Sequence, residues 1–377
     1  MRAVLPKLFD ALMPLLAVLS ALVFGAAMLL LLNVNPFEAY QALFVGGFGS
    51  VSGITQTLAK ATPLLLVGLG IAIAFRASMI NIGGEGQIMA GAMASTMCAL
   101  ALRDLPGIVL LPLSALAGTL AGGFWAFIPG ILKARLGANE ILTTVMMNGI
   151  ALQLTNFLLR GPMLDPAQIA AGTNIPQSEA LPMHVWLPRL VPRTLFHAGF
   201  IVAIVLAVGV YILLWHTTLG YRIRAVGQNR FASRYAGIPV PQYMTLSMTL
   251  SGCFCGLAGA FEIMGVHRRV VEGFSGGYGF SGIVVALFGY LHPLGIIPAS
   301  VLFGGLLVGA DRMQRAVQVP SSLIIALNGL IVLFVVSSRV WVEYRNNRRA
   351  AQQASQDTND DTAAPLPTRP TPEQERA

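Results

Sequence analysis

Residues 75–94 of the chain read FRASMINIGGEGQIMAGAMA and lie between two apolar runs that are each about long enough to cross a membrane. The segment places Asn81, Glu85 and Gln87 around three glycines. A carboxylate at membrane depth is destabilising by roughly 2.5–3.5 kcal/mol unless it faces protein or water. Two interpretations of Glu85 therefore stay open. It borders a functional path, or it caps the helix that follows it near the membrane surface.

The composition is typical of a membrane protein with many spans. Of the 377 residues, 55% are hydrophobic and only 11% are charged, and the mean hydropathy is +0.71. Soluble domains carry about 25% charged residues. The net charge of +8 is explained by basic loops on the cytoplasmic side, and no basic patch interleaved with aromatic residues indicates a nucleic-acid partner. We expect a multi-pass protein of a bacterial inner membrane, in contact with membrane lipid.

Ten apolar runs predict an all-α membrane protein of about ten transmembrane helices. A span needs about 20 apolar residues, but the run 88–102 has only 15. The glycine-rich segment before it must therefore enter the membrane as a broken or re-entrant segment, which is tolerated only against protein or water. The predicted spans cover residues 11–32, 54–75, 88–102, 108–132, 136–159, 198–214, 242–264, 283–291, 294–310 and 321–340.

The same pattern predicts the organisation of the chain, with both termini in the cytoplasm. Residues 1–7 form a cytoplasmic N-terminus and residues 8–342 a transmembrane domain. Within that domain the Pro-rich segment 160–197 is the large external loop, and the basic segment 216–240 is a cytoplasmic loop. Residues 343–377 are polar and Pro-rich, so we expect a disordered cytoplasmic tail.

A second glycine-rich break, GFSGGYGFS, occupies residues 273–281 and precedes another apolar run. Paired interruptions in the two halves of a chain are typical of a midplane transport site and of a weak inverted repeat. The helix start after each break offers N–H groups to substrate oxygens. Candidate path residues therefore include Gly83 in the first break and Phe280 and Ser281 in the second, where Phe280 would stack on an aromatic or sugar ring. Two kinks without a ligand remain the alternative.

Polar residues of the span 136–159 extend this candidate path. Asn139 lies in its first turn and Asn148 in its middle, close to one helical face. Buried amides at such positions either bond neighbouring helices or contact a solute, and both interpretations stay open. No Asp or Glu lies in the centre of any predicted span, so a proton-coupled carrier would lack its usual relay.

Catalytic and metal chemistry are not indicated. Cys253 and Cys255 form a Cys-x-Cys pair without further Cys or His partners, which is not a metal-site pattern. GFSG occurs twice, as around an intramembrane nucleophile, but its only near base, His292, adjoins a proline. None of the three lysines lies in a phosphate-binding Gly-Lys-Ser/Thr motif. We therefore expect no catalytic residue, metal or cofactor, and any ATP hydrolysis must belong to another chain.

Four motifs follow one another along the chain: FRASMINIGGEGQ, LGANEILTTVMMN, AVGQNRFASRYAGI and GGYGFSGIVVALFGYLHPLGI. Together they resemble the permeases of ABC importers of the branched-chain amino acid, ribose and nucleoside class, and above all the simple sugar and nucleoside subgroup. The resemblance implies an alternating-access permease with a second, homologous permease subunit, cytoplasmic ATPase subunits and an extracytoplasmic substrate-binding protein. Because few charged groups are central, a neutral nucleoside or simple sugar suits the path better than an amino acid. A stand-alone carrier or channel is the alternative.

The resemblance also gives the basic loop a role. Residues 230–237 match the short coupling helix that seats on the ATPase, so Arg230, Arg234, Tyr235 and Gly237 are candidate coupling residues. A solvated loop on the positive side of the membrane is the other interpretation.

The chain departs from the subgroup at three positions. Gln228, Ser78 and Ser281 stand where Glu, Gly, and an acid or Thr are frequent. Because Ser281 lies in the candidate path, this departure weakens a choice of nucleoside over sugar.

Overall fold

The computed structural model describes residues 19–20, 22–31, 33–170, 172–173, 175–318 and 329–330. It divides into two compact units, one made of residues 1–28 and 326–377 and the other of residues 29–325. The predicted N-terminus, the tail 343–377 and nearly all of the span 321–340 lie outside the described residues, as does much of the span 11–32.

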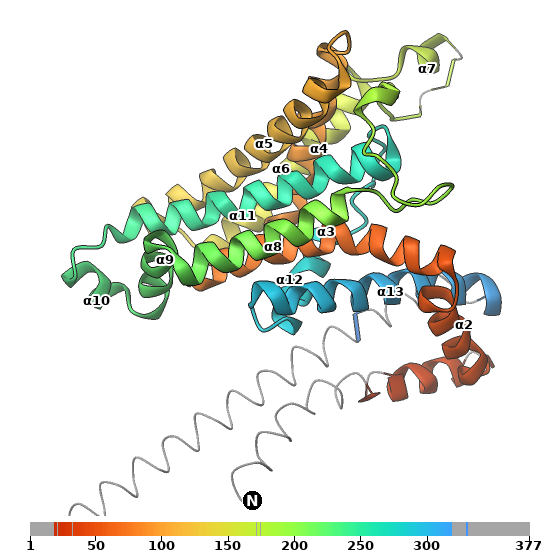
Figure 1. The fold of residues 1–377 in the computed structure, drawn as a ribbon, viewed down its shortest axis with the longest axis horizontal. Coiled ribbons are helices and arrows are strands. Elements are labelled where there is room, and N and C mark those ends of the chain that lie inside the picture. Colours follow the sequence, from red (N-terminus) through yellow and green to blue (C-terminus); the bar gives the residue numbers. More distant parts are fainter. Residues whose placement is uncertain are drawn as a thin grey trace, which may run out of the picture. The chain divides into compact units, whose positions relative to one another are not determined.

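Helices build the whole described part of residues 29–325, and the only strand-like features there are two isolated bridges (Figure 1). The all-α prediction is confirmed. In chain order the helices are α2 (Pro36–Phe48), α3 (Val51–Arg76), α4 (Gly84–Ala101), α5 (Gly107–Leu136), α6 (Glu140–Arg160), α7 (Pro166–Ala170), η1 (Met183–Val185), α8 (Gly199–His216), α9 (Thr218–Gln228), α10 (Arg230–Tyr235), α11 (Val240–Glu262), the π-helical turn η2 (Ile263–His267), α12 (Tyr278–Phe288) and α13 (Pro293–Val317).

Six helices in the described residues are long and apolar enough to cross a membrane, namely α3, α5, α6, α8, α11 extended by η2, and α13. Their bounds agree with predicted spans to within a few residues, except for the later end of α13. Helix α4 has 18 residues but a polar first turn, and its buried positions run from Gly84 to Ala99. Helix α12 has only 11 residues. In the approach to α4, Ala77, Met79, Asn81 and Gly83 are buried, whereas Ser78 and Ile80 are exposed.

Glycines let α4, α5 and α11 pack closely together. A Cβ added to Gly122 of α5 would lie 2.4 Å from the carbonyl oxygen of Gly252, and one added to Gly256 of α11 would lie 2.3 Å from that of Gly118. Gly91 of α4 approaches Gly256 equally closely. These glycines make the close helix contacts possible, because only residues without a side chain allow such backbone approach.

The two ends of this bundle differ. Helices α9 and α10 lie at the end where α8 finishes and α11 begins, and α7 lies at the opposite end (Figure 1). The loop between α6 and α8 is tied to the end of α11, since Leu187 N donates to the Met264 carbonyl at 3.1 Å and Leu181 N to the Arg268 carbonyl at 2.8 Å. The predicted basic loop 216–240 is mostly helical, in α9 and α10.

Candidate translocation site

The break between α3 and α4 is organised by one buried amide. Asn81 is fully buried, and its Nδ2 donates to Gln87 Oε1 at 3.0 Å and to Ser251 Oγ of α11 at 2.8 Å. Its Oδ1 accepts from the backbone N–H of Gly83 at 2.9 Å and from Gln87 Nε2 at 3.0 Å. All four bonds of this side chain are thus made within the protein, which holds the irregular segment 77–83 in one conformation.

A second amide fixes the same break from α6. Asn148 Nδ2 donates to the Ile82 carbonyl at 3.0 Å, and Asn148 Oδ1 accepts from Gly86 N at 2.8 Å. Asn148 therefore satisfies one acceptor just before α4 and one donor in its first turn. These bonds fit the interpretation in which a buried amide of this span bonds a neighbouring helix.

Glu85 does not cap its own helix. The N-cap of α4 is Gly83 and makes no side-chain bond. The Glu85 carboxylate instead lies at the start of α12, where it accepts from Gly279 N at 2.8 Å, from Gly277 N at 3.3 Å and from Ser275 Oγ. The interpretation that Glu85 caps the helix following it does not fit these contacts, because its side chain reaches the start of another helix. The positive end of that helix favours a carboxylate there.

The two breaks meet backbone to backbone at Gly279. A Cβ added there would lie 2.2 Å from Glu85 N and 2.5 Å from Glu85 Cα. The approach to α12 also contains Gly276 and Gly277 with φ of 53° and 80°, in the left-handed region that favours glycine. The second break is glycine-rich because it turns sharply and then touches the start of α4.

The predicted path residues fall into two groups. Asn81, Glu85 and Gln87 are at most 8% exposed, and Gly83 and half-buried Asn148 lie close to them around the first break. Phe280 is 49% exposed and Asn139 is an exposed N-cap of α6, which accepts from Ile141 N at 2.9 Å. Half-buried Ser281 lies in α12. The N–H groups of Gly83, Gly86, Gly277 and Gly279 are all bonded to protein acceptors here.

A model of one protein family matches residues 53–336, and its description is branched-chain amino acid transport system / permease component. This chain belongs to that permease family. It is 38% identical to the guanosine ABC transporter permease protein NupP of Bacillus subtilis, over 88% of this chain and 94% of the relative. It is also 38% identical to the glucose ABC transporter permease protein TsgB13 of Haloferax volcanii, over 88% of both chains. The nucleoside ABC transporter permease protein NupB of Lactococcus lactis is 34% identical, over 87% and 91%.

The predicted coupling residues of the permease lie on an exposed short helix. Asn229 caps α10 by accepting from Phe231 N and Ala232 N, each at 3.0 Å. Phe231 and Tyr235 are 78% and 93% exposed, large values for aromatic side chains. Arg234 and Gly237 are exposed as well, and Gly237 has a φ of 77° that ends the helix.

Arg230 has a different environment, because it faces the first break. Its Nη2 donates to the Ser78 carbonyl at 2.9 Å, and Ser78 Oγ donates to the Gly227 carbonyl at 2.6 Å. A Cβ on Gly227 would lie 2.0 Å from the Arg76 carbonyl oxygen. Helices α9 and α10 of the permease are thus tied to the segment that leads from α3 into α4.

An aromatic cluster reinforces this junction. The guanidinium of Arg76 lies 5.1 Å from the ring centroid of Trp215, that of Arg224 lies 5.7 Å from it, and the His292 ring lies 5.0 Å from it. Arg76 Nη2 also donates to the Leu291 carbonyl at 3.1 Å, in the turn between α12 and α13. The ends of α3, α8 and α12 are therefore held together beside α9 by cation–π and hydrogen-bonding contacts.

Acidic residues elsewhere in the described part are mainly paired. Lys60 Nζ lies 2.6 Å from Asp311 Oδ2, and Lys133 Nζ lies 2.7 Å from Glu140 Oε2. Among these residues no group of three or more His, Cys, Asp or Glu could hold a metal ion.

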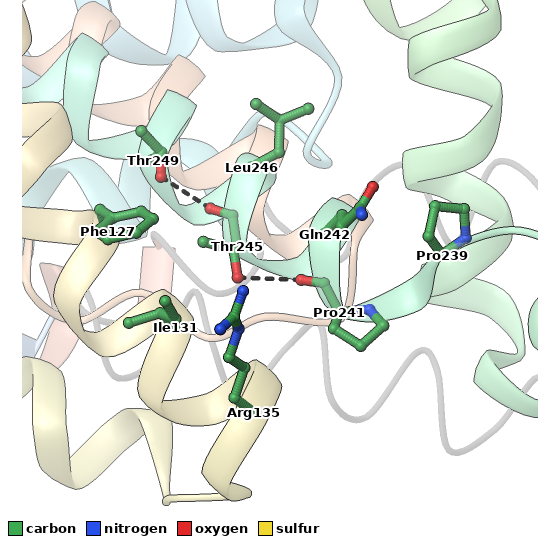
Figure 2. Close-up of a pocket in the computed structure, with 9 residues that line it drawn as sticks. All are labelled: Phe127, Ile131, Arg135, Pro239, Pro241, Gln242, Thr245, Leu246 and Thr249. Carbon is green, nitrogen blue, oxygen red and sulfur yellow. Dashed lines mark hydrogen bonds between the residues drawn. The ribbon is translucent and has the colours of Figure 1, made fainter.

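A groove lies apart from the polar network, between α5 and α11 (Figure 2). Its volume is about 600 Å³, and it contains none of the predicted path or coupling residues. Its lining residues are Phe127, Ile131, Arg135, Pro239, Pro241, Gln242, Thr245, Leu246 and Thr249.

Sequence reasoning missed the partners of the network. Ser251 and Ser275 were not predicted, although Ser275 lies in a GFSG motif that pointed to a nucleophile. Its hydroxyl binds the Glu85 carboxylate, and His292 packs against Trp215. The only sequence signal for Ser275 was its place in the second break.

Proposed function

We propose that this permease is a membrane subunit of an ATP-binding cassette importer that carries a nucleoside, with a simple sugar as the other solute class. Relatives named for guanosine, nucleosides and glucose support both classes. The observation that carries the proposal is the joined pair of breaks, in which Glu85 of α4 holds the start of α12.

The proposed path opens at this junction. If α4 and α12 separate, the N–H groups of Gly277 and Gly279 and the Glu85 carboxylate become available to solute hydroxyls. A neutral polar solute would then replace bonds that the protein makes with itself. Phe280, half-exposed on α12, would stack on a base or a sugar face, and Ser281 would offer a hydroxyl beside it.

The proposed driving force comes from ATPase subunits bound at α10. Exposed Phe231, Arg234 and Tyr235 would form the contact with them, and Arg230 would pass the movement on to the first break through Ser78. A second homologous permease and an extracytoplasmic substrate-binding protein complete the proposed assembly. The permease itself would supply no ATP site.

The proposed topology has ten crossings, both termini in the cytoplasm and α9 and α10 on the cytoplasmic side of a bacterial inner membrane. Six crossings are the long apolar helices. Helices α4 and α12, with their breaks, and the two terminal apolar runs would make up the other four. The meeting of the two breaks supports a weak inverted repeat.

Reconstitution tests the proposal. Liposomes that contain the permease with its ATPase, second permease and binding protein should take up a labelled nucleoside or sugar only with ATP. The permease alone should carry nothing. Uptake by the isolated chain would favour the stand-alone carrier or channel. Arg234→Glu with Tyr235→Ala should prevent ATPase association without loss of folding, and normal assembly would contradict the coupling assignment.

A further inference from the structure

Helices α5 and α11 separate toward one end, and a groove opens between them. Along their middle the two backbones nearly touch through Gly122 and Gly256. Further along, a Cβ added to Gly130 of α5 would lie 3.0 Å from Met248 Cβ and 3.5 Å from Thr245 Cα of α11, so the backbones are less close there. Beyond it lies the groove of about 600 Å³, at the end of the bundle that carries α9 and α10. This volume is in the usual range of small-ligand sites.

The groove combines apolar walls with a cation, Arg135, that has no partner among the residues that the structure describes. Thr245 Oγ1 donates to the Pro241 carbonyl at 3.0 Å and lies 3.5 Å from the Gly130 carbonyl of α5, and Thr249 Oγ1 donates to the Thr245 carbonyl at 2.9 Å. These hydroxyl protons are therefore used within the protein. Arg135 is exposed and makes no hydrogen bond or ion pair within the described residues. Figure 2 shows its guanidinium directed into the groove, toward Thr245.

The neighbouring basic residue of α5 differs from Arg135, because it is paired. Lys133, two residues earlier on α5, lies 2.7 Å from the Glu140 carboxylate, so its positive charge is paired with a negative one. The nearby basic residues of α9 and α10 add further positive charge at this end of the bundle. An unpaired guanidinium above an apolar groove is complementary to a ligand with one anionic oxygen group and a hydrocarbon body.

We propose that this groove binds an anionic phospholipid, with its phosphate on Arg135 and an acyl chain between α5 and α11. The leaflet assignment rests on the proposed function, which places this end of the bundle in the cytoplasm. A nucleoside is a poor occupant, because it needs several polar partners and the walls offer mainly Phe127, Ile131, Leu246 and prolines. The acyl chain leaves other hydrocarbon and not water, so its contribution comes from van der Waals packing against these walls.

The groove also adjoins the coupling segment. Pro239 and Pro241, which line it, follow α10 directly and begin α11. A lipid held here would brace the connection between the ATPase contact and the membrane helices. We therefore expect the bound lipid to affect assembly with the ATPase in addition to stability.

The test is lipid binding by the full chain assembled with its partners. A photoreactive phosphatidylglycerol analogue, in phosphatidylcholine nanodiscs, should label the lining of the groove, and unlabelled phosphatidylglycerol should compete. Arg135→Gln should weaken that competition about fivefold, the factor that corresponds to about 1 kcal/mol for one basic residue near a membrane surface. Arg222→Gln is the matched control. It removes one positive charge at the same end, from a side chain that bonds Tyr243 and lies outside the groove, and it should change labelling little.

A second variant tests the apolar part. Thr249→Phe should fill the groove and reduce labelling with Arg135 unchanged. Equal labelling by phosphatidylcholine and phosphatidylglycerol analogues, or no difference between Arg135→Gln and Arg222→Gln, would overturn the proposal. So would a crosslink from Leu246→Cys to the second permease, which would show that a protein covers the groove. If the assembled transporter with the native chain takes up no solute with ATP but is still labelled by the lipid analogue, the result would count against the proposed function alone.

Discussion

The breaks before α4 and α12 supply opposite halves of one polar contact. The first contributes a side chain, the carboxylate of Glu85, which is turned into the protein. The second contributes backbone N–H groups, at Gly277 and Gly279, on a chain that turns through positive φ at Gly276 and Gly277. Neither half would keep these bonds alone, because the Glu85 carboxylate and the two N–H groups bond each other. The breaks are therefore one structural unit, and each can be weakened separately.

The largest expected effect comes from Glu85→Ala, which removes the contact between the breaks. The N–H groups of Gly277 and Gly279 and the Ser275 hydroxyl would lose their shared acceptor. Hydrogen bonds to charged groups contribute about 1.5–3 kcal/mol each, so we expect a loss of at least about 3 kcal/mol in the free energy of unfolding. Thermal unfolding of the purified chain measures it, and Glu85→Gln, which keeps one acceptor oxygen, should lose less.

Glu272→Ala is the matched control for this experiment. Glu272 precedes the second break but is exposed, and its contact with Arg160 is long, at 3.4 Å. Such surface pairs contribute little, about 0–1 kcal/mol. If Glu85→Ala kept normal thermal stability and still abolished uptake, Glu85 would be a path residue and not the link between the breaks.

His197 supports the approach to the second break, and its expected effect depends on pH. The side chain is 1% exposed and packs on Gly265 in the π-helical turn that ends α11. Burial lowers the pKa of His197 from 6.5 to about 4. Between those values the unfolded chain binds a proton that the folded chain does not, so stability falls as the pH drops from 6.5 toward 4.

The full loss below pH 4 would be about 3 kcal/mol, since each pKa unit corresponds to about 1.36 kcal/mol. Unfolding midpoints measured across this pH range should slope less in His197→Gln than in the native chain. His184→Gln, in an exposed position of the same loop, should leave the slope unchanged. An unchanged slope in His197→Gln would contradict the buried neutral state.

Ser275→Ala tests the second break more gently. It removes one hydroxyl donor from the Glu85 carboxylate and leaves the two backbone N–H bonds in place. We expect a loss of about 1.5 kcal/mol in unfolding free energy, about half of the effect of Glu85→Ala. Equal losses from both variants would mean that the backbone bonds contribute nothing and that the breaks are not joined through the helix start.

The sequence predicts those features that depend on neighbouring residues, and it does not predict those that depend on contacts between distant residues. Apolar length is local, so α3, α5 and α8 were predicted within a few residues. The two breaks were singled out from their positions in the two halves, but their direct contact was not predicted. The direction of individual side chains was not, because Glu85 and Gly279 are 194 residues apart in sequence. Exposure of Phe280 likewise depends on how a short helix is rotated.

Substitutions of Ser78 should have the smallest effect. They separate the penalty of backbone strain in the first break from the stabilisation by a hydrogen bond. This residue has a φ of 53°, which is unfavourable for a residue with a Cβ by about 1–2 kcal/mol. Its hydroxyl bond to the Gly227 carbonyl, at 2.6 Å, offsets part of that penalty. Glycine, frequent here in the subgroup that the chain resembles, would adopt the same φ without strain.

Ser78→Ala should therefore lose about 1 kcal/mol, because the strain stays and the bond goes. Ser78→Gly should be nearly neutral, because the strain goes as well. Unfolding midpoints of the two variants give this comparison directly. Both variants should lower the solute carried per ATP hydrolysed in the assembled transporter, since both remove one of the bonds that tie α9 to the segment leading into α4. Equal destabilisation by both would show that the hydroxyl, and not the backbone conformation, decides which residue fits here.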